Sequence, residues 1–401
     1  MEEKVVTFSK FGDLGNGGIT RLSFSPAALE ARAEFRKRAE ALGLEVLSDD
    51  IGNIYATLQG SESGLKRIAV GSHVDSVRSG GNYDGVYGVL AGLEAIETIV
   101  TEKIPHRHPI TVMIWTNEEG ARFEPAMMCS GIVLGKFEKQ KMLSVVERDG
   151  NMTFGEALDA SGWASYEKNR INPKEYLCYF EPHIEQGPVL EEENLQIGIV
   201  EGVVGMVNYD IILEGVSGHA GTTPQSYRKD ALKAAATVIL DLWDKLGKLD
   251  KKLVFTTGQI LNKPNVHTII PNYVKLTLDS RHQDMDVLAQ VVSVIENLPK
   301  EVCGCKLSYE EHWGRKTIRF NDTLLGYVEG AVKELGYSYK RMYSGAGHDA
   351  QYVSEMLPAV MIFIPSRDGL SHTVVEYSSP DQLEHGANVL LNAVLAADAE
   401  F

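Results

Sequence analysis

Short apolar runs alternate with helical patterns along most of the chain. Ile68–Ser72, Ile110–Thr116 and Ala359–Pro365 are continuous apolar segments, as expected of strands that are buried on both faces of a sheet. Helical spacing separates such runs, and the segment after Ser25 shows a capping serine, Pro26 in the first turn and a glycine at the end. The order of these segments predicts an α/β fold with a mixed, mostly parallel sheet flanked by helices.

The same pattern predicts the other elements of this part of the chain. Helices are expected over Ser25–Gly43, over the amphipathic stretch Val86–Val100 and over Asp381–Ala397. Two further strands, Leu44–Asp49 and Asn53–Leu58, are expected around a Gly52-Asn53 turn.

The pattern changes near residue 205 and returns near residue 315. In between, the strands alternate apolar and polar positions, which is typical of strands with one buried face. Strands are expected over Val207–Gly215, Leu253–Ile260, Val274–Ser280 and Lys306–His312, and helices over Asp230–Gly247 and Asp284–Leu298. We therefore predict a larger domain made of residues 1–205 and 315–401, with a smaller α+β domain, residues 206–314, inserted into it.

The charge balance limits the classes of partner. The chain has 401 residues, of which 44% are hydrophobic, and a formal net charge of −16. It lacks the basic face that non-specific binders of nucleic acid or of anionic membranes need, so neither is expected as a partner. The N-terminal residues MEEKVVTF lack the features of a signal peptide, and the apolar runs are too short to span a bilayer. We expect a cytoplasmic protein whose four cysteines stay reduced.

Polar side chains that are costly to bury follow three of the apolar strands, and a fourth group stands in YFEPHIEQG. They are His73, Asp75, Asp84, Glu118, Glu119, His183, Glu185, Gln186 and His372. Taken alone, each group has an ordinary explanation: a hydrogen-bonded histidine, a solvated acidic pair or a glycine turn. Together they favour a pair of divalent cations at the carboxyl ends of the strands, because buried carboxylates need a counter-charge. Imidazole combined with carboxylate suits Zn²⁺, and also Mn²⁺ or Co²⁺.

Seven motifs occur in order between residues 73 and 373. They are HVDSV, GGNYDGVYGVLAGLE, NEEGARF, EPHIEQGPVLE, SGHAGTTP, SGAGHDA and SHT. This series resembles the M20 metallopeptidase-type amidohydrolases, and within them the hydantoinase/carbamoylase branch of N-carbamoyl-L-amino-acid hydrolases, allantoate amidohydrolases and β-ureidopropionases. The resemblance implies a dinuclear-metal, exopeptidase-like catalytic domain over residues 1–205 and 315–401. It also implies that residues 206–314 form a lid and dimerisation domain.

The resemblance implies a role for each metal-site residue. His73, Asp84 and His183 would hold one metal ion, and Asp84, Glu119 and His372 the other, so that Asp84 bridges the two ions. Asp75 would orient His73 and set its tautomer. Glu118 would be the general base that takes a proton from the attacking water and passes it to the leaving nitrogen.

The resemblance also implies roles for substrate-binding residues. His219 would donate a hydrogen bond to the developing oxyanion from the partner subunit of a homodimer, after a closing motion. Arg281 would bind the substrate carboxylate, Gln186 would lie near the ureido group, and Gly345 and Gly347 would offer backbone N–H groups. Thr268 stands where the branch usually has an asparagine that helps to hold this carboxylate. His348 and Asp349 would support the site from behind.

The resulting hypothesis is a hydrolase that cleaves the C–N bond of an N-carbamoyl L-amino acid or a related ureido acid, with release of ammonia and carbon dioxide. Allantoate amidohydrolase is the alternative that shares all five ligands. An M20-type dipeptidase or aminoacylase is a further alternative, but His183 argues against it because the peptidase branches usually carry a carboxylate there. A binding homologue without turnover is disfavoured, because the complete ligand set stands with Glu118 and His219.

Overall fold

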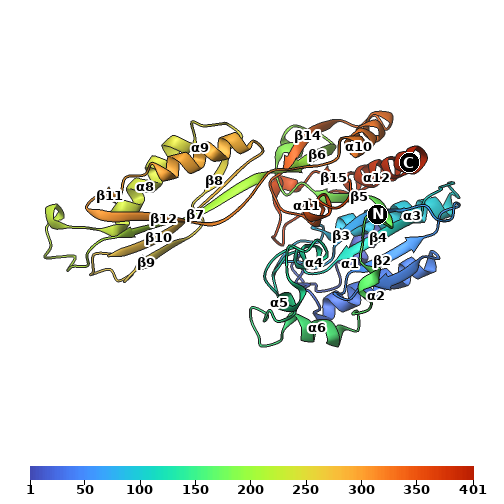
Figure 1. The fold of residues 1–401 in the computed structure, drawn as a ribbon, viewed down its shortest axis with the longest axis horizontal. Helices are drawn as coiled ribbons and strands as arrows, with labels where there is room; N and C mark the ends of the chain where they lie inside the picture. The colour runs from blue at the N-terminus through green and yellow to red at the C-terminus, as the bar shows by residue number, and fades with distance from the viewer. The chain divides into compact units, whose positions relative to one another are not determined.

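A computed structural model describes all 401 residues of the chain, which divide into two compact units (Figure 1). The first unit consists of Met1–Gly202 with Arg319–Phe401, and the second of Val203–Ile318. These divisions lie a few residues from the boundaries at 205 and 315 that the sequence pattern suggested. Each unit has its own hydrophobic core and is described by itself.

The first unit is built on a nine-stranded sheet. Its strands, in chain order, are β1 (Glu45–Ser48), β2 (Ile54–Leu58), β3 (Arg67–His73), β4 (Ile110–Trp115), β5 (Tyr176–Ile184), β6 (Ile197–Val203), β13 (Ile318–Arg319), β14 (Tyr339–Ser344) and β15 (Ala359–Ile364). The helices are α1 (Glu2–Phe8), α2 (Pro26–Ala41), α3 (Val86–Thr101), α4 (Met128–Val133), α5 (Lys139–Leu143), α6 (Phe154–Ser161), α7 (Val189–Glu192), α10 (Asp322–Glu334), α11 (Asp349–Val353) and α12 (Pro380–Glu400).

Four adjacent strands in the middle of this sheet, β4, β3, β5 and β15, run parallel to one another. The edge strands β1 and β2, and β6 beside β15, are antiparallel to their neighbours. The three apolar runs that predicted β3, β4 and β15 are buried almost throughout, which confirms the mixed, mostly parallel sheet. The fourth parallel strand, β5, carries the YFEPHIEQG motif. Because these strands are parallel, the polar groups that follow them meet at one edge of the sheet.

Helix α3 is more deeply buried than its sequence suggested. We expected an amphipathic helix over Val86–Val100, but apolar side chains cover most of its circumference and are buried. The reason is that α3 packs on strands β3, β4 and β5 and is also covered by α12 and α1. Its few polar side chains include Glu94, which forms an ion pair with Lys4 of α1. A helix enclosed from three sides has only a narrow polar stripe.

Side-chain caps begin the long helices, and the cap at Ser25 is the one that the sequence predicted. The Ser25 hydroxyl accepts a hydrogen bond from the N–H of Ala28, and Asp230 and Asp284 cap two helices of the second unit in the same way. Ser379 forms a capping box at the start of α12. These caps satisfy backbone donors that would otherwise lack a partner at each helix start.

The second unit is a six-stranded antiparallel sheet in the order β11-β12-β7-β10-β8, with β9 also paired to β10. Its elements are β7 (Gly205–Glu214), α8 (Ala231–Leu246), β8 (Val254–Thr256), β9 (Ile260–Lys263), β10 (Tyr273–His282), α9 (Met285–Glu296), β11 (Glu301–Val302) and β12 (Cys305–Arg315). Helices α8 and α9 pack on strands β7 and β10. The alternating burial along β10 confirms strands with one buried face.

One predicted strand of this unit is wrong. We expected a continuous strand over Leu253–Ile260, but β8 ends at Thr256 and β9 begins at Ile260. Gly258 lies in the break between them, where the chain leaves the regular ladder. Gln259 keeps the chain close to β10, because its N–H donates to the Thr277 hydroxyl.

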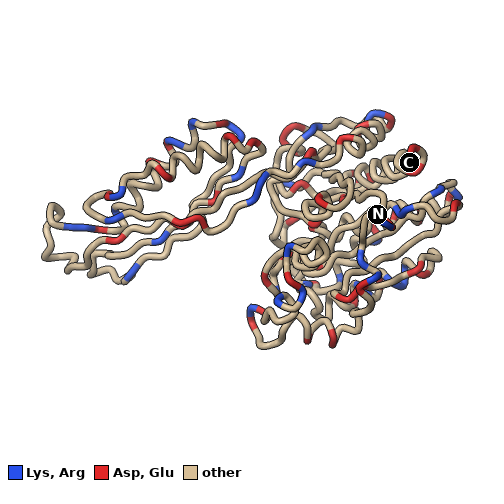
Figure 2. Tube along the Cα trace, in the orientation of Figure 1, with Lys and Arg blue, Asp and Glu red and all other residues tan.

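Lys and Arg residues are interspersed with Asp and Glu along both units (Figure 2). No helix is both long enough and apolar enough to cross a membrane.

Candidate metal centre and active site

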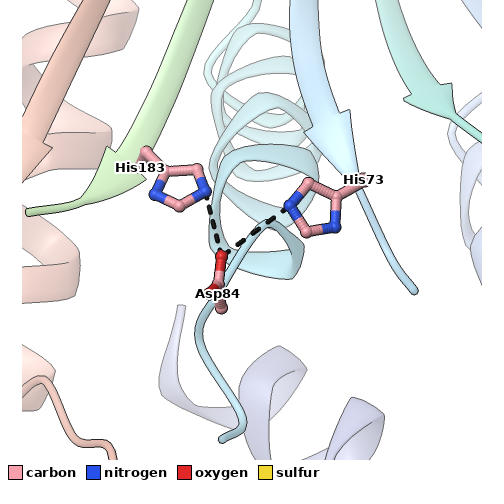
Figure 3. Close-up of side chains that lie close together, drawn as sticks. All are labelled: His73, Asp84 and His183. Carbon is pink, nitrogen blue, oxygen red and sulfur yellow. Dashed lines mark ion pairs between the residues drawn. The ribbon is translucent and has the colours of Figure 1, made fainter. Parts of the chain in front are cut away.

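The first group of candidate ligands stands at the carboxyl ends of two neighbouring strands. His73 is the last residue of β3, His183 lies at the end of β5, and Asp84 comes from the loop that leads into α3 (Figure 3). Asp84 Oδ1 lies 3.2 Å from His183 Nε2 and 3.7 Å from His73 Nε2. All three side chains are buried. The sheet therefore brings together residues that are far apart in the sequence.

Backbone contacts orient both imidazole rings toward Asp84. His73 Nδ1 lies 2.9 Å from the carbonyl oxygen of Asp75, and His183 Nδ1 lies 2.9 Å from that of Ile184. In each ring Nδ1 therefore carries the proton and donates it to the carbonyl. This leaves a lone pair on each Nε2, the atom that faces Asp84, as a metal ligand requires. On His183 this lone pair accepts the backbone N–H of Gly85 at 3.2 Å.

The second group shares Asp84 with the first. Asp84 Oδ2 lies 3.1 Å from His372 Nε2, and the same imidazole atom lies 3.3 Å from Glu119 Oε2. In each group the candidate ligand atoms lie within 4.8 Å of one another. One oxygen of Asp84 thus faces His73 and His183 while the other faces His372. This is the arrangement needed for a carboxylate that bridges two cations.

The turn after β4 sends two adjacent glutamates in different directions. Asn117 and Gly120 have positive φ angles of 58° and 62°, which reverse the chain on either side of the pair. Glu118 Oε2 then lies 3.6 Å from His73 Nε2, whereas Glu119 points toward His372. The Glu118 carbonyl accepts a hydrogen bond of 2.6 Å from the N–H of Met127, which closes the turn. The two side chains can therefore play different roles.

Electrostatics of these carboxylates fit a bound cation. The ion-pair partners of Asp84, Glu118 and Glu119 are all histidines. Burial and the charge of neighbouring carboxylates raise the pKa of Glu118 and of Glu119 well above the usual range. Burial also opposes ionisation of Asp84, but His183 and His372, which can each take up a second proton and then donate from Nε2, outweigh it and hold the pKa of this carboxyl well below its ordinary value.

A buried atom without a partner marks where a cation belongs. Glu119 Oε1 is buried and has no hydrogen-bond partner. An unpaired carboxylate oxygen in such a position is unfavourable by several kcal/mol in order of magnitude. The imidazole and carboxylate donors present here match the ligands preferred by Zn²⁺ and by Mn²⁺ or Co²⁺. The residues therefore fit divalent metal ions.

Asp75 contacts His73 through its backbone carbonyl, and its carboxylate makes separate contacts. Its carboxylate is 3.9 Å from His73 Nδ1, so the closest partner of that atom is the Asp75 carbonyl. The carboxylate instead accepts hydrogen bonds from the N–H groups of Glu118 at 3.4 Å and Glu119 at 3.3 Å, and from the hydroxyl of Ser23 at 3.0 Å. Asp75 thus joins the end of β3 to the turn after β4.

Gly85 is required beside His73. Its φ of 67° lies in the left-handed region, and a Cβ at this position would overlap the imidazole ring of His73. The glycine therefore lets the loop return close enough for Asp84 to face both histidines.

Comparison with known proteins identifies the family. A model of peptidase family M20/M25/M40 matches residues 69–396. The chain belongs to this family. The N-carbamoyl-L-amino-acid amidohydrolase of Rhizobium meliloti is 35% identical over 398 residues, which cover 98% of this chain and 94% of that protein. The allantoate amidohydrolase of Escherichia coli K12 is 33% identical over 393 residues, covering 97% and 95%.

A solved structure agrees with the family assignment. An amidase of the hydantoinase/carbamoylase family from Burkholderia multivorans is 36% identical, and the match covers 100% of this chain and 97% of that one with a TM-score of 0.93. The resemblance that the seven motifs suggested is confirmed.

Several residues of this M20 site were not singled out from the sequence. The Glu181 carboxylate accepts hydrogen bonds from the Ser72 hydroxyl at 2.9 Å and the Ala350 N–H at 2.8 Å, so it joins β3 to the start of α11. Glu376 and Ser371 contact the Asp84 loop. Glu181 stands within the quoted EPHIEQG motif and Glu376 follows SHT closely. Their positions in or next to these motifs could have marked both acidic residues as candidates from the sequence.

His348 and Asp349 contact side chains close to the ligand groups. The ring of His348 packs edge-on against His183 with centroids 4.5 Å apart. Asp349 begins α11 and accepts a hydrogen bond from the hydroxyl of Ser130. Burial raises the pKa of Asp349 well above its usual range.

The candidate substrate residues of the first unit lie next to Asp84 or on a nearby loop. Gln186 Nε2 donates to Asp84 Oδ2 at 2.8 Å, and Gln186 Oε1 is buried without a hydrogen-bond partner. Gly345 and Gly347 lie on the loop between β14 and α11, and neither is buried.

The remaining candidates, His219, Thr268 and Arg281, lie in the second unit. His219 is exposed, and its Nδ1 accepts the N–H of Gly221 at 3.0 Å, so Nε2 carries the ring proton and can donate. The N–H of Ala220 donates to the Thr268 carbonyl at 2.9 Å, which places these two candidates on adjacent segments. Arg281 Nε donates to the Asp279 carboxylate at 2.8 Å.

Proposed function

We propose that this chain is a divalent-metal-dependent hydrolase of the C–N bond in an N-carbamoyl L-amino acid or a related ureido acid. The observation that carries the proposal is the shared Asp84 carboxylate, whose two oxygens face two separate groups of ligands while Glu118 lies beside His73. The names of the relatives, N-carbamoyl-L-amino-acid amidohydrolase and allantoate amidohydrolase, support the substrate class. The products would be ammonia, carbon dioxide and the free amino acid.

His73, Asp84 and His183 would hold one metal ion, and Asp84, Glu119 and His372 a second. Zn²⁺, Mn²⁺ and Co²⁺ all suit these ligands. When bound, such a pair lowers the pKa of water and polarises the substrate carbonyl. Asp75 would hold the turn of Glu118 and Glu119 in place through their backbone N–H groups.

Glu118 would carry the proton through the reaction. Its carboxylate is buried, and burial raises its pKa, which makes it a stronger base than an exposed glutamate. Glu118 would accept a proton from the attacking water and deliver it to the nitrogen that leaves as ammonia. His219 Nε2–H would donate to the oxygen that gains negative charge.

Arg281 would bind the substrate carboxylate through its guanidinium, with Asp279 limiting the guanidinium's rotation. Gln186, Thr268 and the N–H groups of Gly345 and Gly347 would provide further polar contacts. Thr268 has a shorter side chain than the asparagine usual in the branch, so it offers one hydroxyl in place of an amide.

Arg281→Ala is expected to raise KM for N-carbamoyl L-amino acids by roughly 10- to 100-fold, because hydrogen bonds to a charged group contribute about 1.5–3 kcal/mol. The matching N-carbamoyl amino-acid amides lack the carboxylate and should show little change in KM between wild type and variant. Steady-state kinetics with both substrate series test this. Equal losses for acids and amides would place the carboxylate elsewhere.

Ammonia release tests the proposed reaction directly. Mn²⁺-loaded protein is incubated with a panel of N-carbamoyl L-amino acids, with allantoate and with dipeptides, and ammonia is measured against an EDTA-treated sample. Ammonia from carbamoyl amino acids supports the main proposal, whereas ammonia from allantoate alone favours the alternative. Cleavage of dipeptides, without ammonia from any ureido acid, would contradict both and restore the peptidase hypothesis.

We also propose a cytoplasmic homodimer in which residues 206–314 act as the lid and dimerisation domain. The free state of Cys129, Cys178, Cys303 and Cys305 supports a reducing compartment. The outer side of α8 supports a second copy as partner, because Leu240 and Trp243 on it are 72% and 54% exposed.

Mixing two inactive variants tests whether dimers share their sites. If His219 acts across the dimer, His219→Ala combined with Glu118→Gln should recover up to about one quarter of wild-type activity, because half of the dimers are mixed and each holds one intact site. Each variant mixed with itself provides the control. Mixed dimers that form, as shown by tagged copies, yet stay inactive would contradict a shared site.

A further inference from the structure

A buried carboxylate outside the two ligand groups joins the loops that carry them. Glu376 lies four residues after His372 in the sequence, is 4% exposed, and reaches the loop that precedes α3. Its Oε1 accepts the N–H of Tyr83 at 2.9 Å and the N–H of Asp84 at 3.1 Å. Its Oε2 accepts the hydroxyl of Ser371 at 2.8 Å.

These contacts hold the backbone of the shared ligand. His73 and His183 stand on regular strands, whereas Asp84 and His372 stand on loops, so their separation depends on what joins those loops. The Glu376 carboxylate accepts the backbone N–H of Asp84 and the side-chain hydroxyl of Ser371, which is the residue before His372. The Ser371 hydroxyl also lies 3.0 Å from Asp84 Oδ2, so the contact continues to the ligand atom itself.

The glycine-rich loop is shaped to admit this carboxylate. A Cβ at Gly81 would overlap the Glu376 side chain, including its Oε1. Gly81 has no positive φ angle, so the glycine is needed for space and not for backbone conformation. The loop therefore packs directly against the Glu376 side chain.

We propose that Glu376 is a positioning residue that sets the geometry, and hence the metal affinity, of the group Asp84, Glu119 and His372. The inference rests on the proposed role of these residues as metal ligands. Outer partners that orient metal ligands typically contribute about 10- to 100-fold in metal affinity. The effect should fall on this group more than on His73 and His183, which the strands and their own carbonyl contacts hold.

The test measures Mn²⁺ binding by two methods. These are calorimetric titration and metal analysis after dialysis at a fixed concentration of free Mn²⁺. Wild type is expected to bind two ions per chain. Glu376→Ala is expected to weaken the ion held by Asp84, Glu119 and His372 by about 10- to 100-fold, and to weaken the other ion, which shares only Asp84 with this group, by a smaller factor. Unchanged affinity for both ions, or wild type that binds a single ion, would overturn the proposal.

Glu376→Gln separates hydrogen bonding from charge. Its amide oxygen can accept both backbone N–H groups, and its amide nitrogen can donate to Ser371, whose hydroxyl then donates to Asp84 Oδ2. We expect Mn²⁺ affinities within about threefold of wild type, since only a change of geometry should affect the ligands. A Gln variant as weak as the Ala variant would overturn positioning by hydrogen bonds.

Asp398→Ala is the matched control for stability. Asp398 is also a buried carboxylate, and its Oδ1 accepts two successive backbone N–H groups, those of Arg107 and His108. These residues precede β4, at the opposite end of the strand from Glu118. Asp398→Ala should lower the melting temperature yet bind two Mn²⁺ ions as wild type does. Equal loss of one ion in this control would overturn a specific role for Glu376.

Gly81→Ala provides an independent check, because it displaces the same carboxylate by overlap. It should weaken the same Mn²⁺ ion, and the double variant with Glu376→Ala should lose no more than either alone. Additive losses would overturn the shared contact. All readouts are independent of substrate, so a chain that binds two ions but hydrolyses no ureido acid would remove the proposed function and leave this inference standing.

Discussion

Glu118→Gln is expected to lower kcat by about 10²- to 10⁴-fold while both metal ions stay bound, because general-base catalysis contributes a factor of this size. The amide has nearly the same volume as the carboxylate but cannot take a proton from water. Glu118 belongs to neither ligand group, and its Oε2 lies 3.6 Å from His73 Nε2. Metal analysis and steady-state kinetics on the same preparation measure both properties.

A control separates this effect from a general loss of charge. Glu94→Gln removes a partly buried carboxylate that pairs with Lys4 on the outer side of α3, so it should leave kcat within about twofold. Turnover close to wild type in Glu118→Gln would exclude Glu118 as the base. Loss of metal in that variant would instead assign Glu118 to the ligands.

Asp84→Asn is expected to weaken metal binding itself, and turnover with it. Only one oxygen remains in the amide, so one of the two ligand groups loses its shared member. We expect the metal content to fall to one ion per chain or less, and turnover to fall by at least about 10³-fold, because a two-metal site needs both ions.

The corresponding control is Asp50→Asn, which removes a carboxylate that pairs with Arg170 and Lys139 away from the ligand groups. It should bind metal like wild type. An Asp84→Asn variant that still holds two ions with unchanged affinity would show that Asp84 does not bridge them.

Much of the fold could be predicted because local signals and tertiary structure agree. Ser25 caps its helix as predicted, and the buried apolar runs form parallel strands. Prediction was wrong where packing overrode the local pattern. Helix α3 is enclosed by its neighbours. The strand predicted over Leu253–Ile260 is instead interrupted between β8 and β9, where Gly258 stands.

The sequence by itself determined which residue types stand at the ends of apolar strands, and hence that His73, Glu119 and His183 meet at one edge. This follows because parallel strands place their carboxyl ends together. Only the tertiary structure decided which atoms face one another. The contact between Glu376 and Asp84 spans 292 residues of sequence. The Asp75 carboxylate accepts hydrogen bonds from the backbone of Glu118 and Glu119 and not from His73. Such contacts depend on loops whose paths are set by packing across the sheet, and no local pattern encodes them.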